Sequence, residues 1–214
     1  MIILIAGEKG GTGKTTLSTN LAAMRAADGY DTLLIDTDPQ GSSNFWSGTR
    51  VEAEIEPRIS CVLKFGKGLP QEVRALSEKY QDIIIDAGGR DSVEMRSAMV
   101  ACDRLFIPIQ PSQFDVWTLT RMDELVDTAS GFNPDMDAKV VISRASTNPS
   151  IQEAQETAEL LADFEHLALA ESVIRDRIAY RKAAKDGLSV CELKPKDQKA
   201  VAEMTALYEE IFNA

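Results

Sequence analysis

Short apolar runs alternate with longer amphipathic stretches along most of the chain. Runs of about four to eight apolar residues between polar or turn-forming residues are typical of strands buried on both faces of a sheet. Such runs occupy residues 2–6, 32–36, 82–86, 104–109 and 138–143, with weaker ones at 59–63 and 167–173. Apolar residues at helical spacing occupy 14–28, 70–79, 92–101, 115–129, 149–164, 175–186 and 196–212, and the stretch through Trp46 and Gly48 is less regular. This alternation predicts an α/β fold, doubly wound, with a mostly parallel sheet and helices on both faces.

The length and composition suit one compact unit. With 214 residues, of which 44% are hydrophobic, the chain can bury one sizeable core, so residues 1–214 are expected to form a single domain. No apolar window approaches the roughly 20 residues of a membrane span. The three cysteines are scattered and form no C-x-x-C pair, which argues against a zinc or iron–sulfur site. Reduced cysteines and the lack of a membrane segment predict a cytoplasmic protein.

The most informative segment directly follows the first apolar run. Residues 7–16 read GEKGGTGKTT, and a helical pattern begins at the end of this string. In such a strand–loop–helix context, glycines let backbone amides turn inward around a polyphosphate, while Lys14 reaches the β- and γ-phosphates and the Thr15 hydroxyl ligates Mg²⁺. The candidate nucleotide contacts are Gly10, Gly11, Thr12, Gly13, Lys14, Thr15 and Thr16. A chance glycine-rich turn is the alternative, and the flanking strand and helix weigh against it.

Two further apolar runs end in aspartates. The segment TLLIDTDPQ at residues 32–40 places Asp36 and Asp38 on the same side of an extended chain, and the run III is followed by Asp86. Open α/β sheets bind ligands at the carboxyl ends of their strands, so all three should lie beside the glycine loop. One carboxylate can hold the Mg²⁺ hydration shell, and another can orient or deprotonate a water that attacks the γ-phosphate. Without the loop, Asp-Thr-Asp after a strand would more often be a helix cap or a turn.

The string KGGTGKTT resembles the deviant Walker A box of the ParA/MinD superfamily, whose pattern is KGGxGK[ST]. A strict P-loop has glycine six residues before the motif lysine, and this chain has Glu8 there. In that family the early lysine, here Lys9, crosses a dimer interface and touches the nucleotide of the partner. The resemblance therefore implies a homodimer that sandwiches ATP and Mg²⁺, with Lys9, Lys14 and Asp38 as its catalytic residues.

The acidic segments carry the same resemblance. TLLIDTDPQ is similar to the family's DxDPQ box, which assigns Asp36 to the metal shell, Asp38 to the attacking water and Gln40 to the nucleotide. The family's Walker B strand assigns Asp86 to the metal through water, together with Thr15. Many members continue with Asp-Thr-Pro-Pro, whereas this chain has Asp-Ala-Gly-Gly, which is close to the small ParF-type partition proteins. The added glycine favours a mobile loop that senses the γ-phosphate.

The charge of the chain is unevenly distributed. The formal net charge is −11, which argues against a protein that coats nucleic acid with its whole surface. Residues 174–199, however, hold eight Lys/Arg against four Asp/Glu, a net charge of +4 that leaves −15 elsewhere. Residues 171–190 resemble the late basic segment with which ParA proteins hold DNA without sequence preference. The candidate DNA contacts are Arg175, Arg177, Arg181, Lys182 and Lys185. The alternative is a solvated helix face in which these cations pair with nearby carboxylates.

The resemblance implies a ParA-like ATPase, with ATP and Mg²⁺ as cofactors, that binds nucleoid DNA as a dimer. Hydrolysis would be stimulated by a ParB- or ParG-like centromere-binding or adaptor protein, and the expected role is plasmid partition. Positioning of a protein cargo, such as a carboxysome or chemotaxis cluster, remains an alternative. A MinD-like division regulator is disfavoured because the C-terminal helix has an acidic polar face and is expected to pack in the core. A dethiobiotin-synthetase-like enzyme is disfavoured because it needs no trans lysine.

Overall fold

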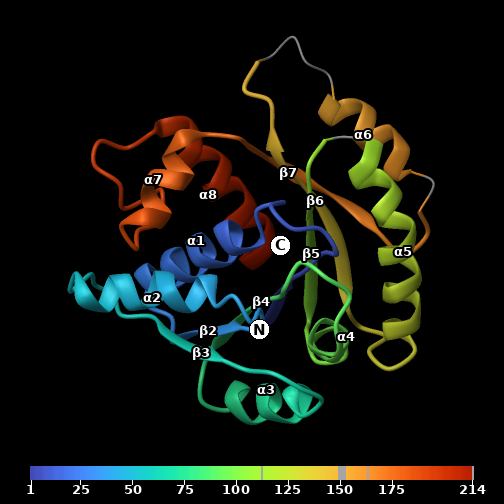
Figure 1. The fold of residues 1–214 in the computed structure, drawn as a ribbon, viewed down its shortest axis with the longest axis horizontal. Coiled ribbons are helices and arrows are strands. Elements are labelled where there is room, and N and C mark those ends of the chain that lie inside the picture. Colours follow the sequence, from blue (N-terminus) through green and yellow to red (C-terminus); the bar gives the residue numbers. More distant parts are fainter. Residues whose placement is uncertain (112, 149–152, 163, 214) are drawn as a thin grey trace.

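The computed structural model describes residues 1–111, 113–148, 153–162 and 164–213 (Figure 1). Its centre is a seven-stranded sheet in the spatial order β3-β2-β4-β1-β5-β6-β7. The strands are β1 (Ile2–Ile5), β2 (Thr32–Asp36), β3 (Ser60–Leu63), β4 (Asp82–Asp86), β5 (Arg104–Ile109), β6 (Asp137–Ala145) and β7 (Ala168–Arg175). Every pair of neighbouring strands runs parallel, so the predicted parallel sheet is confirmed.

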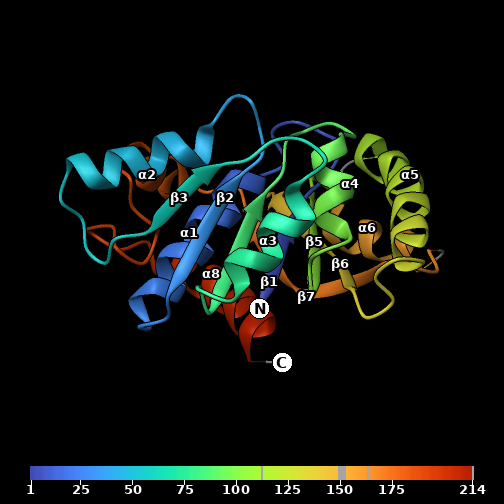
Figure 2. The same cartoon turned by 90° about the horizontal axis from the view of Figure 1, so that it is seen from below.

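Helices cover both faces of this sheet (Figure 2). One face packs against α1 (Lys14–Ala27), α2 (Ser42–Glu52), α7 (Ile178–Lys185) and α8 (Gln198–Phe212). The other face packs against α3 (Leu69–Ser77), α4 (Val93–Met99), α5 (Gln113–Ser130) and α6 (Glu153–Leu161). The doubly wound architecture expected from the sequence is therefore present.

Alternation along the strands explains the two cores. In β1, Ile3 and Ile5 contribute to the core beneath α1 and α8, whereas Ile2 and Leu4 contribute to the core beneath α3, α4 and α5. Because both faces are covered, the strands read as continuous apolar runs rather than as alternating ones. The parallel arrangement also brings the carboxyl ends of β1, β2 and β4 to one edge of the sheet, where their loops meet.

The C-terminal helix α8 packs in the core, as expected. Met204, Leu207 and Ile211 are completely buried in the same cluster as residues of α1. The apolar face of α8 is thus covered by protein. No helix in the described part of the chain is both long enough and apolar enough to cross a membrane.

The stretch between β2 and β3 departs from the prediction, because it contains the helix α2 rather than irregular chain. The buried face of α2 comprises Ser43, Trp46, Ser47 and Arg50. The spacing of these residues is helical, but three of them are polar, so no apolar stripe marks the helix. Each of the three forms hydrogen bonds within the protein; the Glu192 carboxylate, for example, accepts two hydrogen bonds of 2.9 Å from Arg50. Polar residues on a buried helix face hid this element from a pattern based on hydrophobicity.

Two other boundaries shift. Strand β7 continues to Arg175, and α7 begins only at Ile178, so part of the helix expected over 175–186 is strand and turn. The helix expected over 149–164 appears as α6; residues 149–152 and 163 lie outside the described residues.

Candidate active site

A cleft of about 900 Å³ opens at the carboxyl edge of the sheet. Its volume is in the range of pockets that hold cofactors. Five segments line it: the glycine loop with the start of α1, the loop after β2, the loop after β4, the end of β6, and the end of β7 with α7. The residues predicted for catalysis, nucleotide binding or metal binding that line it are Gly10, Gly11, Gly13, Lys14, Thr15, Thr16, Asp38 and Gln40. Thr12, Asp36 and Asp86 are buried behind this lining.

The glycine loop has the backbone of an anion-binding site. Gly11 and Gly13 have φ values of +79° and +103°, which side chains other than glycine rarely allow. A β-carbon at Gly13 would also lie only 2.7 Å from the Ser143 hydroxyl at the end of β6. Helix α1 begins at the next residue, no side chain caps its N-terminus, and its first residues, Lys14, Thr15 and Thr16, line the cleft. An uncapped helix start in a glycine loop favours bound phosphate.

Lys14 is buried within this loop, with only 7% of the residue exposed. Its ammonium donates a hydrogen bond of 2.7 Å to the carbonyl oxygen of Lys9, and thus spans the loop from one side to the other. Burial lowers the pKa of Lys14, while the nearby carboxylates of Asp86 and Asp38 act in the opposite direction. A phosphate seated in the loop would add a further negative charge beside this buried amine.

Asp86 collects three hydroxyl groups at the end of β4. Its carboxylate accepts hydrogen bonds from Thr15 at 2.8 Å, from Ser43 at 2.7 Å and from Ser18 at 3.3 Å. Burial raises the pKa of Asp86 to about 6, although the hydroxyls of Ser43 and Thr15 oppose the shift. Asp36 lies nearby at the end of β2, and its two carboxylate oxygens accept the backbone amides of Asp38 and Asn44 at 3.0 Å. Burial raises the pKa of Asp36 as well.

These oxygen atoms fit Mg²⁺. The hydroxyl of Thr15 and the carboxylate of Asp86 are hard ligands within one hydrogen bond of each other. The described residues contain no group of three or more His, Cys, Asp or Glu side chains arranged to enclose a metal. Mg²⁺ keeps several waters and is usually bound by one or two protein groups together with substrate phosphates, a role open to Thr15 and Asp86.

We expect Asp86→Asn to stabilise the protein in the absence of nucleotide. Burial raises the pKa of Asp86 to about 6 in the folded protein, above the ordinary aspartate value of 3.8 that applies in the unfolded chain. As the pH rises from about 4 to 6, the unfolded chain loses the Asp86 proton before the folded protein does, so the free energy of unfolding falls. Above pH 6 the ionised, buried carboxylate keeps the free energy of unfolding low. Removing the charge should raise Tm by about 3–8 °C near pH 7.5.

Thermal denaturation followed by circular dichroism at pH 5 and pH 7.5 measures this effect. The gain in Tm should be clearly larger at pH 7.5, where the native carboxyl is ionised. A gain of equal size at both pH values would show that it does not come from the charge.

The loop after β4 lies against both the glycine loop and Asp38. A β-carbon at Gly89 would lie 3.1 Å from backbone atoms of Gly10, and one at Gly88 would lie 3.5 Å from the Asp38 carboxylate. Asp38 is partly exposed to the cleft, and it accepts the backbone amide of Gln40 at 3.0 Å. The glycines found after Asp86 in the sequence thus permit close contact between three loops.

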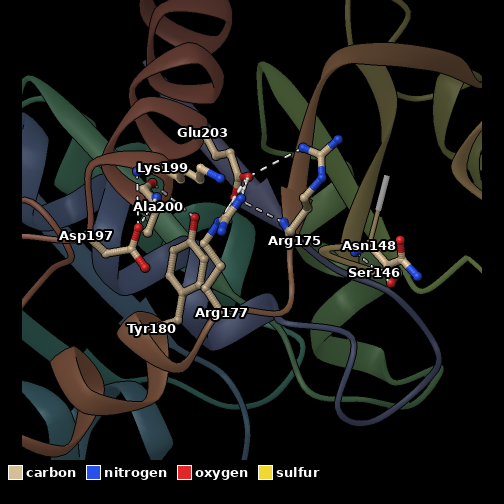
Figure 3. Close-up of polar contacts among 9 residues, drawn as sticks. All are labelled: Ser146, Asn148, Arg175, Arg177, Tyr180, Asp197, Lys199, Ala200 and Glu203. Atoms are coloured by element: carbon tan, nitrogen blue, oxygen red, sulfur yellow. Dashed lines mark hydrogen bonds and ion pairs between the residues drawn. The ribbon is translucent and has the colours of Figure 1, made fainter. Parts of the chain in front are cut away.

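The basic segment enters the same cleft. Arg175, Arg177 and Arg181 line its far end, and Figure 3 shows Glu203 of α8 bound to the first two. Arg177 donates to Glu203 at 2.6 Å and its side chain is only 14% exposed, while Arg175 lies 3.4 Å from the same carboxylate. Arg181 lies 3.3 Å from Asp176.

The two lysines of the basic segment are different. Lys182 and Lys185 are exposed on α7 and form no ion pair within the described part of the chain. The five candidate DNA contacts thus divide into arginines with carboxylate partners and two lysines that face solvent.

Sequence reasoning missed several residues of the site. Ser43 could not be predicted because the sequence pattern did not reveal helix α2, and Ser18 looked like an ordinary helix residue. Arg144, at the end of β6, donates a hydrogen bond of 2.7 Å to the Gly11 carbonyl and lies 3.8 Å from Asp176. Its position directly after a predicted strand was the one available signal, because that edge of the sheet holds the ligand.

The comparisons with known proteins agree with this geometry. The family described as the CobQ/CobB/MinD/ParA nucleotide binding domain matches residues 3–190. Maintenance of carboxysome distribution protein A of Halothiobacillus neapolitanus is 27% identical over 98% of this chain and 95% of that protein. Sporulation initiation inhibitor protein Soj of Bacillus subtilis is 26% identical over 93% of each chain. The crystal structure of a putative plasmid partition protein from Borrelia burgdorferi, bound to AMPPNP, has a TM-score of 0.76 at 19% identity and covers 99% of this chain and 98% of that one.

The family match extends over most of the chain and confirms the resemblance to the ParA/MinD superfamily. The phosphate loop, the buried lysine and the hydroxyl–carboxylate pair of Thr15 and Asp86 are the parts that ATP and Mg²⁺ require. The chain therefore belongs to the CobQ/CobB/MinD/ParA nucleotide-binding domain family, as an ATPase that uses ATP and Mg²⁺.

Proposed function

We propose that this ATPase forms an ATP-dependent homodimer that holds nucleoid DNA without sequence preference and segregates a plasmid. A ParB- or ParG-like centromere-binding or adaptor protein would stimulate hydrolysis and so release the DNA. One observation carries this proposal: the basic segment at the end of β7 and the start of α7 lines the same cleft as the phosphate-binding loop. A nucleotide in this cleft would influence the basic surface directly, and DNA binding would then depend on the nucleotide.

The geometry of the cleft supports the following roles in hydrolysis. Lys14 and the first amides of α1 would bind the β- and γ-phosphates. Thr15 would hold Mg²⁺ directly, with Asp36 and Asp86 acting through water, and the metal would neutralise charge on the phosphate oxygens. Asp38 would orient a water and take its proton as the water oxygen bonds to the γ-phosphorus. The bond from that phosphorus to the β-phosphate oxygen then breaks, which yields ADP and phosphate.

Lys9 would act on the second subunit. Its backbone is held inside the loop, because its carbonyl oxygen accepts the Lys14 ammonium at 2.7 Å. The next residue, Gly10, is exposed at the cleft, so Lys9 is presented from a fixed point at the rim. We therefore propose that its side chain contacts the partner's nucleotide, which would make a complete site depend on dimerisation.

DNA contact would fall mainly on Lys182 and Lys185. Arg177 already has a carboxylate partner and little exposed surface, so a phosphate would have to compete with Glu203 for it. The two lysines are exposed on one short helix and are available to phosphates. Two subunits double the number of contacts, and phosphate contacts give an affinity that falls steeply with salt.

Reversing both charges, with Lys182→Glu and Lys185→Glu, is expected to weaken DNA binding in ATP by at least about 100-fold at 50 mM salt. ATP binding and basal hydrolysis should stay within about twofold, because neither lysine lines the cleft. Gel shift with a labelled duplex of arbitrary sequence and a phosphate-release assay measure the two effects.

The matched control changes two other exposed lysines, with Lys67→Glu and Lys79→Glu. These flank α3 on the opposite face of the sheet and change the net charge by the same amount. If the control pair weakens DNA binding as much as the α7 pair does, the effect belongs to overall charge and α7 is not the DNA surface.

Positioning of a protein cargo is a second candidate role, and one observation supports it. The relative from Halothiobacillus neapolitanus, which is named for maintenance of carboxysome distribution, is similar to this chain over nearly the full length of both proteins. We propose protein-cargo positioning as the alternative role of the same motor. The adaptor decides between the two: a stimulating protein that binds a specific DNA sequence supports partition, and one that binds a protein assembly supports positioning.

A further inference from the structure

A network of charged side chains joins the phosphate-binding loop to the loop after β4. Glu8, which stands where a strict P-loop has glycine, follows β1 after Ala6 and Gly7, and its side chain is only 14% exposed. Its carboxylate lies 2.9 Å from Nε of Arg121 on α5. Burial raises the pKa of Glu8, and the Arg121 charge opposes that shift. The residue that breaks the general motif therefore has a specific partner.

Arg121 also contacts the second loop. Its Nη2 donates to the Asp91 carboxylate at 2.9 Å, so one guanidinium bridges two carboxylates from different loops. Asp91 is held in addition by Arg96 of α4, through hydrogen bonds of 2.6 and 2.5 Å. These contacts with Arg96 and Arg121 hold the pKa of Asp91 below its usual value. The planar fork of arginine suits such a bridge, whereas the single ammonium of lysine does not.

The two bridged loops are also in backbone contact. Gly89 packs so closely on Gly10 that a β-carbon would lie 3.1 Å from its backbone. Lys9 lies between Glu8 and Gly10, and Gly88 lies beside the Asp38 carboxylate. Through this arrangement, a shift of either loop would move the residues proposed to act on the γ-phosphate.

Arg121 itself does not line the cleft, although Asp91 does. Its side chain is 58% exposed, so its ion pairs should add little to the stability of the fold. We propose that Arg121 is a positioning residue of ATP hydrolysis, which holds the phosphate-binding loop and the β4–α4 loop together as one unit. This inference depends on ATP hydrolysis alone and not on the DNA binding proposed above.

The test compares Arg121→Ala with the unchanged protein in a steady-state phosphate-release assay. Loss of the bridge should lower kcat at least about tenfold, because small misplacements of reacting groups have large effects on rate. KM for ATP should stay within about twofold and Tm within about 2 °C, since Arg121 neither touches the nucleotide nor contributes much to stability. Arg121→Lys should recover only part of the loss. Arg58→Ala is the control, because Arg58 forms an exposed pair with Glu56 far from the loops.

A double-mutant cycle with Glu8→Gln completes the test and covers the case in which the alanine variant unfolds. Glu8→Gln keeps the shape of the side chain and removes its charge, and it should lower kcat in the same direction. The double variant should be no slower than the slower single variant, because both changes remove one bridge. A kcat within twofold of the unchanged protein for both single variants, a change confined to KM, or strictly additive effects would each overturn the proposal.

Discussion

Asp38→Ala is expected to lower ATP turnover by about 10²- to 10⁴-fold while ATP still binds. Asp38 is the partly exposed carboxylate of the three at this edge, and it borders the cleft beside Gly88. Asp36 and Asp86 are buried, and their oxygen atoms already accept amides or hydroxyls. Of the three, Asp38 is therefore the one best placed to orient and deprotonate a water.

Because ATP binding survives this change, the ATP-bound dimer should accumulate. Size-exclusion chromatography with light scattering in Mg·ATP should show a dimer for Asp38→Ala that persists for as long as ATP is present. Asp135→Ala, in an exposed loop, is the matched control and should keep normal turnover. Turnover by Asp38→Ala within tenfold of the unchanged protein would remove Asp38 from the role of base.

Lys9→Ala is expected to abolish the ATP-dependent dimer. The change removes only the side chain, so the Lys9 carbonyl that holds the Lys14 ammonium remains, and the loop keeps its shape. ATP should therefore still bind to the monomer with an affinity within a few fold. Combining Lys9→Ala with Asp38→Ala makes the test sharper, because hydrolysis can then no longer explain the loss of a dimer.

Lys67→Ala serves as the control for this experiment, since Lys67 is an exposed loop lysine outside the cleft. Sedimentation velocity in Mg·ATP should show a monomer for the Lys9 variant and a dimer for the control. A stable dimer of Lys9→Ala together with Asp38→Ala would contradict the trans role, and Lys9 would then have to act within its own subunit.

The sequence predicted those parts of the fold and the site that depend on neighbouring residues. Strands β1, β2 and β4 are buried on both faces, so they appear as plain apolar runs. Two of them, β2 and β4, end at Asp36 and Asp86 of the site. The glycine loop could be read because Gly11 and Gly13 must adopt conformations that few other residues tolerate. Both signals come from requirements that act on neighbouring residues, and such requirements are visible in a sequence.

Other parts of the site depend on partners that are distant along the chain. Helix α2 buries polar residues. The buried guanidinium of Arg50 is neutralised by the carboxylate of Glu192, which lies far along the chain and accepts two hydrogen bonds from it. The pairing of Arg177 with Glu203 likewise requires α8 to cross the start of α7. The basic segment therefore looked more uniform in the sequence than in the fold. There the arginines pair with carboxylates, whereas Lys182 and Lys185 form no ion pair with any residue that the structure describes.

Glu8 illustrates the same limit in another way. In the sequence it appeared only as a departure from the strict phosphate-loop pattern. In the fold it meets Arg121 of α5, more than a hundred residues away, and so becomes part of a bridge between two loops. No pattern of neighbouring residues could have revealed that contact.

The proposed function requires that the nucleotide controls DNA binding. Its most direct test is the affinity of the unchanged protein for a duplex of arbitrary sequence, measured by gel shift or fluorescence anisotropy without nucleotide, with Mg·ADP and with Mg·ATP, at two salt concentrations. We expect binding at least about tenfold tighter in ATP than in the other two states, and weaker in every state at the higher salt. Equal affinity in all three states at low salt would contradict it.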